Sequence, residues 1–220
     1  MPGVREITID DIEIGEKIGQ GGFSTIHVGK LNGTPVAIKK IFDPRLTDEL
    51  LNEIQNEIVM QSILRHPGIV MLMGVIPQIP NLYIVQEHVQ QGSLYDMLHV
   101  KKQMTALSLS QSLQIAIDSS IVFEYMHHLG IAHRDIKSHN VLIDHNFNVK
   151  ICDFGLAKFT VSLNSHQIFL TFIFYFFRLI LVKVRCNMQV HQRTWLQNFS
   201  RKGNMISRLM CLHLAACSGR

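Results

Sequence analysis

The sequence has few of the features that mark secreted, disulfide-linked or zinc-binding proteins. Its four cysteines form no C-x-x-C pair, and neither they nor its 12 histidines show the spacing of zinc ligands. Residues 1–8 contain no apolar stretch that could act as a secretory signal. We therefore expect a reduced, cytoplasmic setting.

Acidic side chains are missing from the C-terminal part of the chain. All 17 Asp and Glu residues lie before position 161, whereas residues 161–220 carry only basic charges. The formal net charge of +4 therefore comes from this tail. Because the rest of the chain is acidic overall, the net charge does not indicate a nucleic-acid partner.

A long apolar run is also missing. Residues 168–182 are mostly Phe, Ile and Leu, but they are fewer than the roughly 20 residues that span a bilayer. Arg178 lies among them, and a charge inside a membrane helix is costly. We expect no membrane anchor, and a membrane-tethered protein is the alternative that rests on this stretch alone.

Apolar periodicity divides residues 12–159 into a strand-rich first part and a helix-rich second part. Short apolar runs bounded by turn residues predict strands at 12–42, 69–76, 82–85, 141–143 and 149–151. Wider apolar spacing predicts helices from Thr47 to about Leu64, at 94–99 and at 108–128. This order predicts a small sheet that carries one helix, followed by a mainly helical lobe.

A glycine-rich turn opens the strand-rich part. Gly19, Gly21 and Gly22 would let backbone N–H groups approach a phosphate, although an ordinary glycine-rich hairpin has the same pattern. Lys39 follows in an otherwise apolar strand, where its charge needs an anionic partner. Phosphate oxygens and a helix glutamate would meet that need.

The helix-rich part contains two more motifs, His133-Arg134-Asp135-Ile136-Lys137-Ser138-His139-Asn140 and Asp153-Phe154-Gly155. Together with the glycine-rich turn and Lys39, they stand in the order typical of the protein kinase family, which residues 12–159 resemble. The resemblance implies an α+β, two-lobed fold. An antiparallel sheet plus one helix would occupy about 12–85, a hinge 86–92, and a truncated, mainly helical lobe 93–160.

The resemblance also implies roles in phosphoryl transfer from MgATP. Asp135 would accept the hydrogen bond of the substrate hydroxyl, and Lys137 would steady the transferred phosphoryl group. Asn140 and Asp153 would hold two Mg²⁺ ions that bridge the phosphate oxygens. A Lys two places after the catalytic Asp is the serine/threonine pattern of the family, so a protein Ser or Thr is the expected acceptor.

Matching to the family position by position also outlines an ATP site. Lys39 would hold the α- and β-phosphates, with Glu57 as its helix partner and Glu53, one turn earlier, as the runner-up. The matched positions are Ile18, Gly19, Gln20, Gly21, Gly22, Phe23, Ser24, Ile26, Ala37, Lys39, Glu57, Glu87, Val89, Ser93 and Leu142.

Within that set, the adenine ring would lie between a roof of Ile18, Ile26 and Ala37 and a floor of Leu142. The hinge backbone would come from Glu87 and Val89, and Ser93 would face the ribose.

Two neighbouring positions leave questions open. Gln86 occupies the position that guards the back of the pocket, where Thr, Met or a bulky apolar residue is commoner in the family. Cys152 could be a reactive thiol that faces the phosphates or a buried, inert one.

Segments 68–70 and 91–94 are similar to the tyrosine-kinase-like group of serine/threonine kinases.

After residue 159 the segments expected of a kinase are not recognisable. A catalytically impaired nucleotide-binding or interaction fragment is therefore the alternative to an active kinase. Val161-Ser162 fits the splice-donor sequence GTAAGT, and the T-rich codons of Phe, Ile and Leu suit an intron. In a shifted frame, codons from Gln189 onward permit G-T-P-E-Y-M-A-P-E and Y-D-F-K-A-D-V-F-A-F-G, which are the missing kinase segments.

We interpret residues from about 161 to 220 as a retained intron followed by the next exon out of frame. We expect this tail to be disordered or poorly packed. The intron boundaries stay open, because removing a whole number of codons would not restore the frame.

Overall fold

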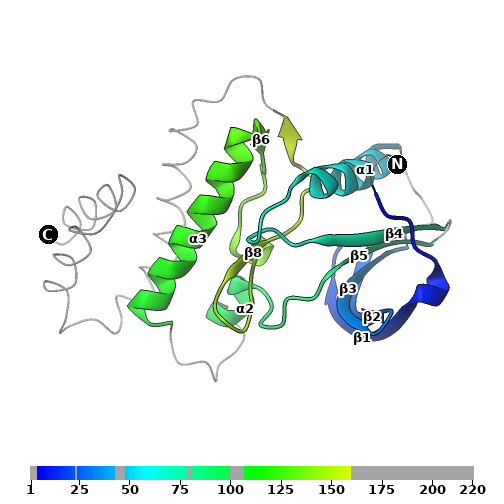
Figure 1. Cartoon of the computed structure of the whole chain (residues 1–220), viewed down its shortest axis with the longest axis horizontal. Coiled ribbons are helices and arrows are strands. Elements are labelled where there is room, and N and C mark those ends of the chain that lie inside the picture. Colours follow the sequence, from blue (N-terminus) through cyan, green and yellow to red (C-terminus); the bar gives the residue numbers. More distant parts are fainter. Residues whose placement is uncertain (1–3, 23, 43–47, 79–80, 100–106, 160–220) are drawn as a thin grey trace, which may run out of the picture. The chain divides into compact units, whose positions relative to one another are not determined.

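A five-stranded antiparallel sheet forms the first part of the chain (Figure 1). The computed structural model describes residues 4–22, 24–42, 48–78, 81–99 and 107–159, all of them within the unit Met1–Phe177. In spatial order the strands are β1 (Ile12–Gln20), β2 (Ser24–Leu31), β3 (Thr34–Ile41), β5 (Asn81–Glu87) and β4 (Leu72–Gln78). Asn32 and Gly33 join β2 to β3 with φ of 48° and 83°, as the two-residue turn of a β-hairpin requires.

Helix α1 (Asp48–Ile63) packs on this sheet. Ile54 and Ile58, four residues apart on one helix face, are buried in a cluster with side chains of the sheet. The sheet residues of that cluster are Ile41, Val75 and Ile84. The expected helix is thus present, although its expected first residue, Thr47, lies outside the described residues.

In the described residues after β5 the helices are α2 (Leu94–His99) and α3 (Leu109–His128). Ser108 starts α3 with a capping box: its Oγ accepts from the Gln111 backbone N–H at 3.2 Å, and the Gln111 Oε1 accepts from the Ser108 N–H at 2.9 Å. Gly130 follows the helix with φ of 68°, which favours glycine at this place. No helix in the described ranges has the length and apolarity needed to cross a membrane, and the stretch 168–182 lies outside those ranges.

Short strands surround the predicted catalytic loop. Strand β6 (Ile131–Ala132) pairs with β9 (Lys158–Phe159), and β7 (Val141–Ile143) pairs with β8 (Val149–Ile151). The loop 133–140 therefore runs from β6 to β7 and ends in a 3-10 turn (Ser138–Asn140). Asp153 lies between β8 and β9.

One predicted strand boundary is wrong. The apolar run at 69–76 forms a strand only from Leu72. The residues before it pair with β8 instead, because Val70 N donates to Ile151 O at 2.9 Å and Ile151 N donates to Gly68 O at 2.8 Å. Residues 68–70 therefore contact the second lobe, whereas residues from Leu72 onward belong to the sheet. The predicted α+β, two-lobed fold is confirmed.

Candidate active site

Lys39 and Glu57 form a close ion pair between β3 and α1. Lys39 Nζ lies 2.7 Å from Glu57 Oε2 and 2.9 Å from Oε1. The Glu57 side chain is only 6% exposed, whereas Glu53 is exposed on the same helix. Burial lowers the pKa of Lys39, but the Glu57 carboxylate, with a smaller contribution from Asp153, outweighs burial and leaves the pKa raised. The lysine is therefore a permanent cation at neutral pH.

Two side chains of the predicted catalytic loop donate to the carboxylate of a third, Asp135. Lys137 Nζ lies 2.6 Å from Asp135 Oδ2, and Asn140 Nδ2 donates to the same oxygen at 3.0 Å. Burial raises the pKa of Asp135, but these two hydrogen bonds outweigh it and leave the pKa below its usual range. The Asp135 carboxylate is therefore ionised and held in one orientation.

His133 supports this loop from the interior. Its Nδ1 accepts from the Asp135 backbone N–H at 3.3 Å, and its Nε2 lies 3.0 Å from Cys152 O. This pattern needs a neutral ring that carries its proton on Nε2. Burial lowers the pKa of His133, which keeps the ring neutral. Phe154 packs on the same ring at a centroid distance of 5.1 Å.

Asn140 and Asp153 supply oxygen donors that suit Mg²⁺. Asn140 Nδ2 donates to Asp135 O and Oδ2, which leaves its Oδ1 as an acceptor. One amide oxygen and one carboxylate fit an ion that usually keeps water and phosphate oxygens among its ligands. Within the described part of the chain, no group of three or more His, Cys, Asp or Glu residues is placed to hold a metal. The donor set thus fits Mg²⁺ that arrives with a nucleotide.

The glycine-rich turn connects β1 to β2. Gly21 N donates to Ser24 O at 2.8 Å, and a Cβ on Gly21 would lie 2.9 Å from Ser24 Oγ. A side chain at Gly21 would therefore require the Ser24 hydroxyl to move. Gly19, Gln20 and Gly22 are described beside it, whereas Phe23 lies outside the described residues.

The expected roof of the adenine site comes from β1, β2 and β3, which pair with one another. Ile26 lies opposite Gly19 on one side and Lys39 on the other, and Ala37 lies opposite Gln86. Of the other positions in this set, Ile18 is exposed, Leu142 and Glu87 are half-buried, and Val89 is buried.

The Ser93 hydroxyl forms hydrogen bonds within the protein. Its Oγ donates to Asp96 Oδ2 at 2.6 Å and accepts from the Asp96 N–H at 3.1 Å. Its backbone bridges to Leu142. The hydroxyl thus caps the start of α2.

Burial keeps the Cys152 thiol protonated. It raises the pKa of the thiol to about 12, and the nearby Asp153 and Glu57 carboxylates act in the same direction. The Sγ lies 3.6 Å from Asn140 O. Of the two alternatives for Cys152, this environment favours the inert thiol.

Sequence reasoning did not identify two polar contacts beside the site. Gln86 Nε2 donates to Gln61 Oε1 at 2.8 Å, and Glu87 Oε1 lies 2.7 Å from Lys150 Nζ on β8. The signal for Gln61 was available, because it lies four residues after Glu57 on the same helix face. No comparable signal marks Lys150, whose partner is far away in the sequence.

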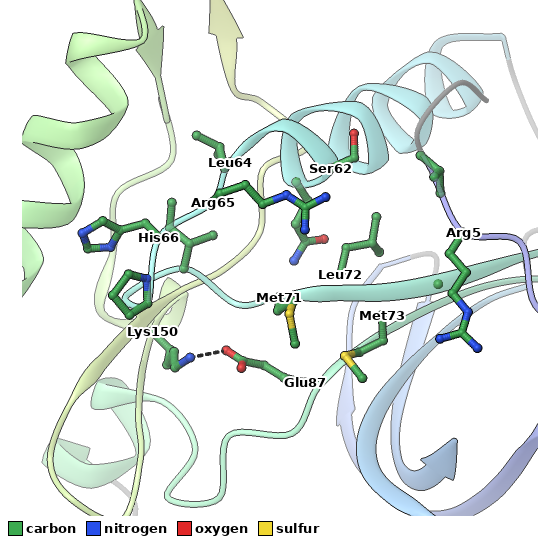
Figure 2. A pocket seen from close by; sticks show the side chains of 15 residues that line it. Arg5, Ser62, Leu64, Arg65, His66, Met71, Leu72, Met73, Glu87 and Lys150 are labelled. Atoms are coloured by element: carbon green, nitrogen blue, oxygen red, sulfur yellow. Dashed lines mark ion pairs between the residues drawn. The ribbon is translucent and has the colours of Figure 1, made fainter. Parts of the chain in front are cut away.

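A pocket of about 610 Å³ borders the Gln61 side chain and the Glu87–Lys150 pair (Figure 2). Arg5, Arg65 and Met71 line it, and the Glu87–Lys150 pair forms part of its wall. Glu87 is the only position matched to ATP binding that it includes. The pocket is therefore distinct from the residues predicted to bind phosphate and to act in catalysis.

Residues 12–176 match the family model described as Protein kinase domain. The chain is 41% identical over 155 residues to the probable serine/threonine-protein kinase SIS8 of Arabidopsis thaliana, and 40% identical over 154 residues to the serine/threonine-protein kinase CTR1 of the same plant. It is 35% identical over 153 residues to the probable serine/threonine-protein kinase drkB of Dictyostelium discoideum. These matches cover 70%, 69% and 70% of this chain, but only 15%, 19% and 22% of the relatives.

Proposed function

The chain belongs to the protein kinase family, and we propose that it binds ATP with Mg²⁺ and transfers the γ-phosphate to Ser or Thr hydroxyls of proteins. The observation that carries this proposal is the ionised Asp135, which Lys137 and Asn140 hold at 2.6 and 3.0 Å. A carboxylate in that state can accept a hydrogen bond from a hydroxyl and orient its oxygen for in-line attack.

The surrounding residues neutralise and position the nucleotide in this proposal. Lys39, kept cationic by Glu57, binds the α- and β-phosphates, and Lys137 stabilises the charge on the transferred group. Asn140 Oδ1 and the Asp153 carboxylate hold Mg²⁺. When bound, Mg²⁺ would draw together and neutralise the phosphate oxygens.

The rest of the ATP site is proposed on the same grounds. The backbone of residues 19–24 would cover the phosphates, and Ile18, Ile26, Ala37 and Leu142 would enclose adenine. Glu87 and Val89 would offer backbone groups to it, and Ser93 would border the ribose.

Two observations support a Ser or Thr acceptor. Lys137 stands two residues after Asp135, which is the serine/threonine pattern of the family. SIS8, CTR1 and drkB carry serine/threonine-protein kinase in their names. CTR1 and SIS8 also fit the tyrosine-kinase-like group that segments 68–70 and 91–94 resemble. We propose that the chain acts in the cytoplasm and that its substrates are proteins.

ATP binding and phosphate transfer test the function separately. We expect the chain to bind MgATP, and Asp135→Asn to retain binding while losing transfer to a Ser/Thr peptide library. The same pair of measurements should be made on a chain whose frame is restored after residue 160. Binding without transfer in the 220-residue chain alone would identify it as the impaired nucleotide-binding fragment. No binding in either chain would reject the proposal.

We propose that residues 12–160 are the kinase part and that residues from about 161 to 220 come from a retained intron and a shifted frame. The lobes would be 12–85 and 93–160, with a hinge at 86–92. The family match runs to residue 176, and the tail lies outside the described residues. Sequencing the spliced transcript tests this proposal, which fails if the transcript contains no removable intron here.

A further inference from the structure

Asn56 links helix α1 to the segment that follows Asp153. Its Nδ2 donates to the main-chain oxygens of Ala157 at 2.8 Å, Gly155 at 3.0 Å and Phe154 at 3.5 Å. One amide group thus gathers carbonyls from a short stretch of chain far away in the sequence. Its two N–H groups can serve the two nearer oxygens, and the third oxygen lies at the limit of hydrogen bonding.

The gathered carbonyls belong to a tight turn. Ala157 N donates to Phe154 O at 3.0 Å, which closes the turn 154–157. The side chains of Phe154 and Ala157 are fully buried, so the turn is anchored on both sides. Asp153, directly before it, has φ of 65°, a conformation that costs a non-glycine residue about 1 kcal/mol or more unless neighbouring contacts hold it.

Because Asn56 lies beside Glu57 on α1, this contact and the ion pair with Lys39 depend on the same helix. The next residue, Glu57, pairs with Lys39. Consecutive residues of one helix therefore hold the proposed phosphate-binding lysine and the turn that carries the proposed metal ligand. A displacement of α1 would disturb both contacts at once.

We propose that Asn56 is a positioning residue, which fixes the Asp153 carboxylate for Mg²⁺ by holding the turn 154–157 against α1. Mg²⁺-dependent binding of ATP then depends on the Asn56 side-chain amide. This inference rests on the proposed nucleotide-binding function, and it concerns the coupling of the metal ligand to the helix rather than the chemistry of transfer.

Two substitutions remove the contact in different ways. Asn56→Asp keeps the shape of the side chain but replaces the donor by an oxygen, which would repel the three carbonyl oxygens. Asn56→Ala removes the group without repulsion. Asn52→Asp is the matched control, because Asn52 is exposed on the same helix and the substitution introduces the same charge.

The test compares ATP affinity in excess Mg²⁺ and in EDTA by isothermal titration calorimetry on the full chain. In Mg²⁺ we expect Asn56→Asp to raise the Kd roughly tenfold and Asn56→Ala about fivefold, as the loss of a net hydrogen bond or two predicts. Asn52→Asp should change it less than about twofold, and in EDTA all variants should agree with the wild type within about twofold.

Three results would overturn the inference. Equal loss of affinity in Mg²⁺ and in EDTA would show that Asn56 only supports the fold. An affinity in Mg²⁺ that is unchanged in both Asn56 variants would show that Asn56 does not position Asp153. A wild type that binds no ATP under either condition would reject the proposed function together with this inference. That failure is recognised without any variant. Far-UV circular dichroism checks folding, and Asn56→Ala decides the test if Asn56→Asp unfolds.

Discussion

Gln86 on β5 and Gln61 on α1 are joined by a hydrogen bond of 2.8 Å between Nε2 and Oε1. Gln61 is 3% exposed, and its own Nε2 donates to Val70 O at 2.9 Å. A chain of amides thus links the strand behind the proposed adenine site to α1 and to the residues before β4. Buried polar pairs of this kind are costly when one member is missing.

This relation predicts non-additive effects of substitution. Gln61→Leu should lower the free energy of unfolding by about 2 kcal/mol, because the Gln86 amide loses its partner. Gln61→Leu with Gln86→Leu should cost less than the sum of the two single changes by about 1 kcal/mol. Urea unfolding of the four proteins gives the coupling energy, and additivity within about 0.5 kcal/mol would show that the two amides are independent.

The Lys39–Glu57 pair predicts a second non-additive effect of substitution on stability. Lys39→Met leaves the nearly buried Glu57 carboxylate without its partner and should cost about 3 kcal/mol of stability. Adding Glu57→Leu should recover most of that loss, because an apolar pair carries no desolvation cost. Thermal unfolding of both variants measures the difference, and a double variant no more stable than Lys39→Met would contradict the interpretation.

The pH dependence of this pair follows from the raised pKa of Lys39. The stabilisation is complete below the ordinary lysine value of 10.5 and is lost as the pH rises through the folded-state pKa. The stability difference between wild type and Lys39→Met, measured by urea unfolding, should therefore shrink as the pH rises above that value.

Much of the site could be predicted from the sequence because its residues stand in short, ordered motifs. Glu57 was preferred to Glu53 by matching, and the structure brings Glu57 to Lys39. Gln61 could not be paired in advance, since helix periodicity gives its face but not its partner on β5. Asn56 and the turn 154–157 are far apart in the sequence, and only the packing of α1 brings them together.

The pairing partner of the strand predicted at 69–76 could not be predicted from the sequence either. An apolar, β-branched run predicts extended backbone, but it does not specify which strand it pairs with. Here residues 68–70 pair with β8, and the run joins the sheet only from Leu72.

His133 predicts a loss of stability in mild acid. Burial lowers the pKa of its ring, so below the ordinary value of 6.5 the unfolded chain binds a proton that the folded chain does not. Stability should therefore fall as the pH decreases from that value toward the folded-state pKa, by up to about 1.4 kcal/mol per pH unit.

Two variants isolate this effect from that of the other histidines. His133→Asn cannot titrate, so its stability difference from the wild type should become smaller as the pH falls. His145→Asn, at an exposed position, serves as the control. A His133→Asn difference that stays constant from neutral pH to below pH 6 would show that the ring is not held neutral by burial.

Cys152 should resist alkylation as long as the chain is folded. Burial raises its pKa to about 12, so only about one thiol in 10⁵ is ionised at neutral pH, and the thiolate is the reactive form. In urea the pKa should return to about 8.5 and the same thiol should react readily. Mass spectrometry of the peptide that contains Cys152, after iodoacetamide treatment with and without urea, separates it from the cysteines of the tail. Rapid modification of that peptide in the folded chain at neutral pH would show instead that Cys152 is the reactive thiol.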